Sequence, residues 1–473
     1  MQAKGGVAGW AAAEFGATDL GDIRRTRRLV AMAAGAALRP SGKVSAVFDR
    51  SRDREGAYDF LENAHVDADA VAASVFDATL KRATGNKVVF VAIDGSSLSL
   101  PDGAGSKGFG PVGSPNCPAT GLIMMNALAT TRDGVPLGLI DQIWWSRPPR
   151  DNLTRAERLR RNASRPFEEK EPSKVLDAAK NTVERLARAN IDAWIVVDRE
   201  ADNADVLLGL HDLGCRFTVR GGKYDRRVID EDLPRVQAML DAQPSLGTYE
   251  VEAKARGGKR KIATVDVRAA QVTLRFDAYA DRPAGGLRLF AVRIRDASGA
   301  ADGPDWLLYT NIPVLTAEHA REIVRSYETR WRVEEFHRTW KQGQCNVEDA
   351  QLHTQNAVII WATILASVAT RVERLKYLSR RTPNEPATIE MRPVEIEILK
   401  LDQKQRWTKP KRVPKEPTIA QATAWVAELG GWIGPANGPP GSITLSRGLE
   451  RLGYLVEGFE LALRAQAAAR GGT

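Results

Sequence analysis

The chain has 473 residues, of which 43% are hydrophobic and 27% charged, and its net charge is +9. This length is enough for a large core and two or three domains, and the positive charge favours a polyanionic partner. Three cysteines without a CxxC pair argue against a disulfide framework and a cysteine-based zinc site. The first residues lack an apolar signal core, and the longest apolar run, 357–370, is too short to span a bilayer. We therefore expect a cytoplasmic protein.

The first 68 residues have a helical pattern, with Asp19 as a candidate N-cap. One side of the first long helix is predicted to be apolar, through Ile23, Leu29, Val30 and Met32. The same helix carries four arginines within five positions, which repel each other unless phosphates neutralise them: Arg24, Arg25, Arg27 and Arg28. We interpret residues 1–68 as a DNA-binding domain. The alternative is a solvated helix face.

Two short apolar runs, 87–94 and 193–198, each end in an aspartate. Runs of this kind are typical of strands buried on both faces, and ligands bind at the carboxyl ends of such strands in open α/β sheets. Asp198 is also a candidate N-cap, since residues 201–213 have a helical pattern. No clear helical pattern follows Asp94, so N-capping is a weaker explanation for this aspartate than for Asp198.

The order of the predicted elements indicates a ribonuclease-H-like α/β domain. Strands are expected at 87–94, 121–131, 135–144, 193–198 and 216–220, and helices at 173–189 and 201–213. An Asp-Gly turn joins the second and third strands. A β-rich insertion at about 221–304 and a long helix follow. In this arrangement adjacent central strands bring Asp94 and Asp198 together.

The long helix carries four functional side-chain types on one stripe. Relative to Tyr327, Arg330 lies at roughly −60°, Glu334 at roughly −20° and Lys341 at roughly −40° around the helix axis. A carboxylate flanked by cations and an aromatic ring suits metal-dependent chemistry at a phosphodiester. Glu335 points away from the stripe. The alternative interpretation is a solvated helix face with i,i+4 ion pairs.

These residues resemble the DDE transposases of the insertion-sequence-four family, nearly end to end. The family has a tyrosine, an arginine, a glutamate and a lysine separated by two, three and six residues, which Tyr327, Arg330, Glu334 and Lys341 match. The segments 198–202 and 20–30, and Glu55-Gly56-Ala57-Tyr58, also resemble the family. The sequence around Asp94 is a looser match and one residue shorter, and Asp102 is a weaker alternative for the first acid.

The resemblance implies that Asp94, Asp198 and Glu334 form a catalytic, metal-binding triad. Its cofactor would be two Mg²⁺ ions per active site, with Mn²⁺ as a substitute. Tyr327, Arg330 and Lys341 would contact DNA phosphates near the scissile bond. Two further residues complete the expected DNA contacts: Trp306, which would stack on a flipped base or else be an ordinary core aromatic of strand 305–311, and Arg220 at a strand end.

The resemblance also implies a cut-and-paste activity on DNA in four phosphoryl transfers. Water nicks one strand, the freed 3′-hydroxyl forms a hairpin, the hairpin is opened, and the 3′ end joins target DNA. Domains are expected at 1–68, 69–372 (catalytic, ribonuclease-H-like) and 373–473 (linker and C-terminal helical dimerisation domain). The partners would be transposon-end and target DNA and a second copy of the chain, on the bacterial nucleoid.

A C-terminal apolar seam bears on the dimer. Leu445, Leu449, Leu452, Val456, Phe459 and Leu463 repeat at intervals of four and three residues. Packing within the C-terminal domain is the alternative to packing between subunits. Two other functions stay open: a ribonuclease-H-like nuclease that does not transfer strands, and a non-catalytic DNA-binding relative.

Overall fold

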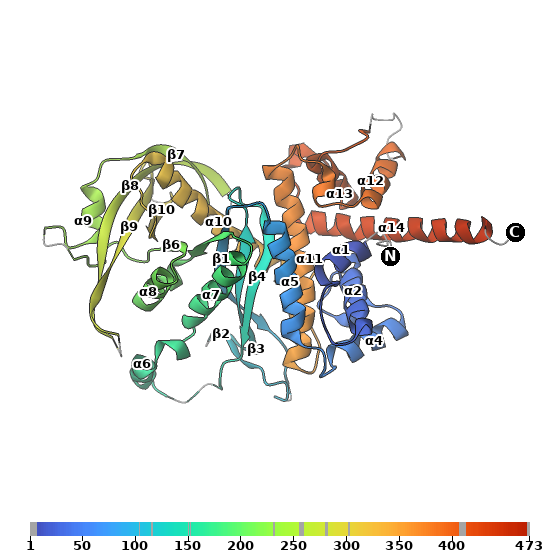
Figure 1. Ribbon diagram of the computed structural model, residues 1–473, viewed down its shortest axis with the longest axis horizontal. Coiled ribbons are helices and arrows are strands. Elements are labelled where there is room, and N and C mark those ends of the chain that lie inside the picture. Colours follow the sequence, from blue (N-terminus) through green and yellow to red (C-terminus); the bar gives the residue numbers. More distant parts are fainter. Residues whose placement is uncertain are drawn as a thin grey trace.

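The computed structural model describes residues 7–470, apart from short gaps at 104, 115–116, 150, 152, 230–231, 255–259, 280–281, 301–302 and 406–412. Figure 1 shows a twisted sheet on one side of the molecule and helices on the other. Two long helices, α5 (Ala68–Ala83) and α11 (Gln355–Arg381), run side by side between these halves. None of the described helices combines the length and apolar character that a membrane span requires.

The sheet is mixed and has ten strands in the order β2-β3-β1-β5-β6-β10-β9-β8-β7, with β4 paired to β3. Strands β1, β5 and β6 are parallel, and the neighbours on either side are antiparallel. This mixed α/β architecture is consistent with a ribonuclease-H-like domain. The strands are β1 (Val88–Ser99), β2 (Gly110–Ser114), β3 (Cys117–Thr130), β4 (Pro136–Trp145), β5 (Asp192–Val197), β6 (Arg216–Arg220), β7 (Gly247–Lys254), β8 (Arg260–Phe276), β9 (Gly285–Asp296) and β10 (Asp305–Thr310).

The register of β1 against β5 aligns the two candidate aspartates. Ala92 pairs with Val196, so Asp94 lies opposite the end of β5, where Asp198 follows. The prediction that β1 ends at Asp94 was wrong, because the strand continues to Ser99. Beyond the end of β5, β1 still pairs with β3 as far as Ser99, and these backbone hydrogen bonds keep it extended.

Helices cover both faces of the parallel strands, and alternate residues separate two cores. On one face α7 (Ser173–Ala187) and α8 (Ala204–Asp212) pack in a cluster with Val91 and Ile195. On the other face α10 (Ala317–Lys341) packs against Ala92 and Val196. Of the smaller helices, α9 (Val236–Asp241) packs against β8 and β9, and α6 (Arg155–Ser164) lies at the bottom of the view in Figure 1.

The N-terminal helices are α1 (Val7–Phe15), α2 (Ile23–Leu38), α3 (Val44–Val47) and α4 (Ser51–Leu61). The predicted cap of α2 was wrong: Asp22 caps the helix, accepting from the Arg24 amide at 2.8 Å. Asp19 instead accepts from the amide of Gly21, whose positive φ turns the chain before the helix begins. Leu29 and Met32 are buried, but Ile23 is 61% exposed, contrary to the predicted apolar side.

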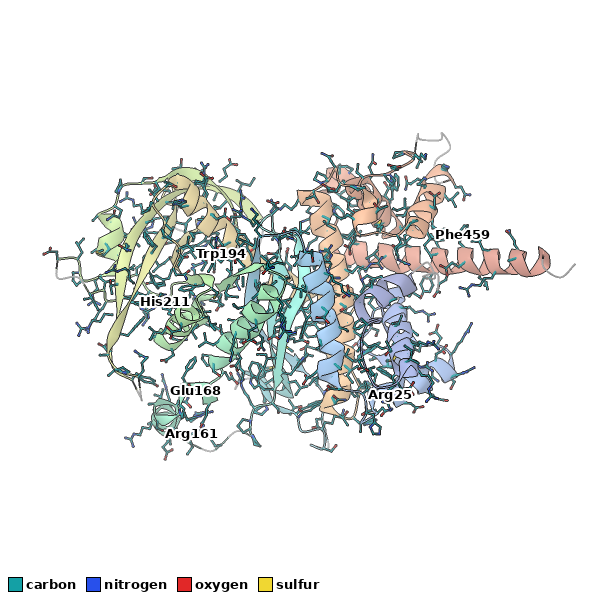
Figure 2. The ribbon with its side chains drawn as sticks, viewed as in Figure 1. Arg25, Arg161, Glu168, Trp194, His211 and Phe459 are labelled. Atoms are coloured by element: carbon teal, nitrogen blue, oxygen red, sulfur yellow. The ribbon has the colours of Figure 1, made fainter. Side chains whose placement is uncertain are left out.

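The C-terminal helices are α12 (Pro393–Gln405), α13 (Ile419–Leu429) and α14 (Ser442–Arg470). Helices α13 and α14 pack against α11, and α12 packs against α13 and α14. The predicted seam divides along α14. Its first four residues, from Leu445 to Val456, are buried in the C-terminal core, and Leu463 is 50% exposed. Figure 1 shows α14 projecting away from the rest of the chain, and Figure 2 labels Phe459 on this helix. The alternative, packing within the domain, therefore holds for the first part of the seam.

Two glycines of α14 are expected to respond in opposite ways to alanine. A Cβ at Gly448 would lie 1.9 Å from the Val426 carbonyl oxygen of α13, whereas one at Gly458 meets open space. We expect Gly448→Ala to destabilise the protein by about 1–3 kcal/mol through overpacking. Gly458→Ala should stabilise it by about 0.5–1 kcal/mol through helix propensity. Chemical denaturation of both variants measures this, and equal effects would contradict the packing of α13 on α14.

Candidate active site and DNA-contact surface

Asp94 and Asp198 line one cavity of about 330 Å³ beside the carboxyl end of β5. Asp198 Oδ1 accepts from the Glu200 amide at 2.8 Å and so caps a short 3₁₀ turn, Arg199–Ala201. The helix predicted at 201–213 begins instead at Ala204, and Asn203 caps it. Asp198 therefore caps the turn and also faces the cavity, so the two interpretations of this residue are compatible.

Glu334 approaches Asp94 from α10, with the guanidinium of Arg330 between them. Arg330 Nη2 lies 3.0 Å from Glu334 Oε1, and Nη1 lies 4.0 Å from Asp94 Oδ2. Arg330 is only 8% exposed, and its Nη1 is buried without a hydrogen-bond partner. The pair has the i,i+4 spacing of the alternative interpretation, but its burial excludes a solvated helix face at this point.

Burial, together with the neighbouring carboxylates, changes the protonation of Asp94. Burial, with Glu334, Asp198 and Glu200 nearby, raises the pKa of Asp94 to about 7, although Arg330 acts in the opposite direction. Burial is the largest cause, and Arg330 offsets only part of it. Glu200 was not identified from the sequence as part of this acidic group.

The donor set of the site suits a hard divalent cation, because carboxylate oxygens are the ligands that Mg²⁺ prefers. In the part of the chain that the structure describes, no three His, Cys, Asp or Glu side chains converge closely enough to hold a metal ion. Glu334 instead pairs with the guanidinium of Arg330, at 3.0 Å. The residues fit the cation chemically, provided that Glu334 exchanges its arginine partner for the metal.

Four of the predicted DNA-contact residues form an aromatic and basic group beside the acids. Trp306 on β10 and Tyr327 on α10 meet edge to face, with ring centroids 5.5 Å apart. The Arg220 guanidinium at the end of β6 lies 5.9 Å from the Trp306 centroid and 5.7 Å from that of Tyr327. Arg330 lies 5.9 Å from the Tyr327 ring. Trp306 is half-buried, so it contributes to the core and retains an exposed part.

Lys341 lies at the other end of the stripe, against the last residues of β1. Its Nζ donates to the Ser97 carbonyl oxygen at 2.6 Å and lies 3.5 Å from Glu348 Oε1. Glu348 in turn accepts from the Ser99 amide at 2.8 Å. Asp102, the weaker alternative for the first acid, accepts from the amides of two loop residues at 3.1 Å and organises its own loop.

The four N-terminal arginines are not part of this site. Figure 2 labels Arg25 among the N-terminal helices, on the far side of α5 and α11 from the insertion strands. Arg24 pairs with Asp22 at 2.7 Å, and Arg25 donates to the Leu20 carbonyl oxygen at 2.9 Å. Arg27 is exposed, and Arg28 lies against Gly56 of α4. This helix presents positive charge on a separate surface.

Two comparisons with known families agree with these two surfaces. Residues 7–66 match the model of a transposase DNA-binding family, and residues 173–370 match that of a transposase DDE domain. The first match covers α1 to α4, including the four arginines. The second contains Asp198 and Glu334, whereas Asp94 precedes it.

The raised pKa of Asp94 predicts a pH-dependent effect of Asp94→Asn on stability. The native carboxyl keeps its proton up to about pH 7, whereas the unfolded one loses it near the ordinary aspartate pKa of 3.8. The wild type therefore loses stability as the pH rises from about 4 to 7, by up to about 4 kcal/mol. The Asn variant avoids this loss, so its advantage should grow over that range and then level off.

Thermal unfolding in EDTA at several pH values measures this advantage. Asp59→Asn, at an exposed position on α4, is the matched control and should show no comparable pH dependence. An advantage of Asp94→Asn that does not vary between pH 4 and 7 would contradict the raised pKa of this buried carboxyl.

Proposed function

We propose that this chain, which its two domain matches make a DDE transposase, cuts DNA at transposon ends and joins the 3′ ends to target DNA. We assign it to the insertion-sequence-four family, with motifs like those of the transposon-five transposase. One observation carries the proposal: Asp94, Asp198 and Glu334 come from three distant segments, and Asp198 and Glu334 lie close enough to Asp94 to raise its pKa.

Asp94, Asp198 and Glu334 would hold Mg²⁺ or Mn²⁺, two ions in the full site. Bound there, the ions would stabilise the attacking and leaving oxygens of an in-line displacement at phosphorus. The chain's own part is to supply three carboxylates from a rigid sheet and one long helix. Glu334 becomes available when Arg330 leaves it, and a DNA phosphate is a suitable new partner, since guanidinium groups bind phosphate in a bidentate manner.

The aromatic and basic group would hold the DNA close to the acids. Arg220 and Arg330 flank the Tyr327 ring, so they can bind phosphates on either side of it. The exposed part of Trp306 offers a stacking surface for a base that leaves the helix, a contact worth about 1–3 kcal/mol. This combination supports a hairpin intermediate, because a sharply reversed strand must expel a base.

The remaining parts of the chain would bind the end sequence and a second subunit. Arg24 and Arg27 expose positive charge on α2, within the match to the DNA-binding family. The later part of α14, with Leu461 and Leu463 exposed, extends the seam beyond the core. We infer a homodimer in the DNA complex that uses this part of α14, acting on the bacterial nucleoid.

Glu334→Gln should retain binding to transposon-end DNA and lose strand cleavage, because it removes one carboxylate of the triad. The assay incubates the protein with candidate inverted repeats and Mg²⁺, with gel shifts for binding and denaturing gels for cleavage. Glu335→Gln is the matched control: Glu335 accepts from Tyr377 and pairs with Arg332 and Lys376, so this variant should lose stability but still cleave. Normal cleavage by Glu334→Gln would remove Glu334 from the triad.

Excised DNA should pass through a covalently closed hairpin, and Trp306→Ala should reduce the amount that forms. We expect a loss of about tenfold or more, which corresponds to the stacking energy of one base. Trp306→Phe keeps a stacking ring and should recover part of it. Denaturing gels separate closed hairpins from open ends. Open ends alone, with efficient cleavage, would refute the hairpin and favour a nuclease that does not transfer strands.

A further inference from the structure

A row of three polar residues crosses the sheet next to the acid cluster. Asp94 on β1 pairs in register with Asn126 on β3, and Asn126 pairs with Gln142 on β4. The neighbours of Asp94 and Asn126 on this face, such as Ala92 and Leu128, belong to an apolar cluster with α10. Asn126 is fully buried, so its amide must find partners within the protein.

His337 on α10, three residues after Glu334, lies against Asp94 and Asn126 of this row. Its Nε2 lies 2.8 Å from Asn126 Nδ2, and its Nδ1 lies 3.8 Å from Asp94 Oδ2. The ring thus stands between the buried amide and the first acid. His337 was not identified from the sequence, because Asn126 and Asp94 reach it only through the strand register.

The donor and acceptor of each hydrogen bond in this row can be assigned from the indole of Trp144. The Trp144 Nε1–H can only donate, and it donates to Gln142 Oε1 at 3.0 Å. Gln142 Nε2 must then donate to Asn126 Oδ1, at 2.7 Å. Asn126 Nδ2 is left to donate to His337 Nε2, which must accept. The neutral ring therefore carries its proton on Nδ1, the nitrogen that faces Asp94.

We propose that His337 is a positioning residue, whose Nδ1–H orients the Asp94 carboxylate for cation binding. The inference rests on the proposed function of Asp94. The distance of 3.8 Å is longer than a hydrogen bond, but a shift of about 1 Å closes it, and such bonds commonly tighten only in the reactive complex. A donor fixed on one carboxylate oxygen directs the other oxygen to the ion.

The position of His337 on α10 couples the two acids. Glu334 lies one turn before His337 on α10, so the helix carries an acid of the triad and the group that orients another. Asn126 and Gln142 fix the ring to the sheet, which keeps this relation rigid. Groups that orient a metal ligand in this way commonly change metal affinity or activity by about 10- to 100-fold when mutated.

The first test determines the tautomer directly in the wild-type protein. The chain has five histidines, so ¹⁵N-labelled histidine gives few signals in long-range ¹H–¹⁵N spectra. His337→Gln identifies the His337 signals. We expect a proton on Nδ1 and a bare Nε2. A proton on Nε2 would overturn the proposal, because the bare nitrogen would then face Asp94.

The second test compares two variants that retain different ends of the imidazole. In His337→Asn the amide nitrogen takes the approximate place of Nδ1 and keeps a donor toward Asp94. In His337→Gln the amide reaches the place of Nε2 and keeps the link to Asn126 only. Mn²⁺ binding to the complex with pre-cleaved end DNA is measured by electron paramagnetic resonance, with cleavage rates and thermal unfolding alongside.

We expect His337→Gln to weaken Mn²⁺ binding and cleavage by about 10- to 100-fold, and His337→Asn to stay within a few-fold of wild type. A residue that merely ties α10 to the sheet gives the reverse order, which would overturn the proposal. Mn²⁺ binding needs no catalysis. The expected order in Mn²⁺ affinity, without cleavage by the wild type, would support the positioning role while the proposed function fails.

Discussion

The rest of the site depends on one electrostatic constraint: carboxylates gathered beneath a helix need a cation among them. Arg330 supplies that charge in the free protein, between Asp94 and Glu334, at 4.0 and 3.0 Å. Arg330 does not offset the burial of Asp94, whose pKa is still raised to about 7. A buried group that keeps its proton near neutral pH lowers the stability of the fold, and such arrangements occur where function requires them. The free protein thus holds a group of acids that bound metal ions would stabilise.

The acids are brought together by two neighbouring strands of unequal length, β5 and β1. Strand β5 stops at Val197, whereas β1 runs on to Ser99 through its pairing with β3. The chain after β5 therefore turns beside the middle of β1 and places Asp198 next to Asp94. Helix α10 then crosses this point with 25 residues in one continuous piece. Because this one helix carries Tyr327, Arg330, Glu334 and Lys341, helix geometry sets the relative positions of their backbone attachments.

Much of this arrangement was predictable, and the failures have physical causes. Strand β6 and the start of α7 agree with the prediction, because apolar runs and helical periodicity are local signals. The end of β1 was missed because its last residues depend on pairing with β3, which lies 20 or more residues away. The N-cap of α2 was predicted wrongly because the chain turns at Gly21, and the sequence does not determine the positive φ of that residue.

The apolar seam of α14 is buried only in its first part. Periodicity identifies the apolar side of a helix, but it does not show how far other helices cover that side. The role of His337 could not be predicted, because the sequence does not show which strand residues contact a single histidine. Its neighbours follow from the strand register that aligns Asp94, Asn126 and Gln142.

On the proposed function, the position of Arg330 would couple the binding of DNA to the binding of metal ions. In the free protein its guanidinium engages the same carboxylate that would hold a cation. If a phosphate draws Arg330 away, Glu334 becomes available, so bound DNA favours the cation. Linkage makes the effect reciprocal: bound cations displace Arg330 and thereby favour DNA. In this coupling Arg330 changes its partner from Glu334 to a DNA phosphate, and the sheet does not need to move. An enzyme built in this way completes its catalytic site only when its substrate is in place, which limits indiscriminate hydrolysis.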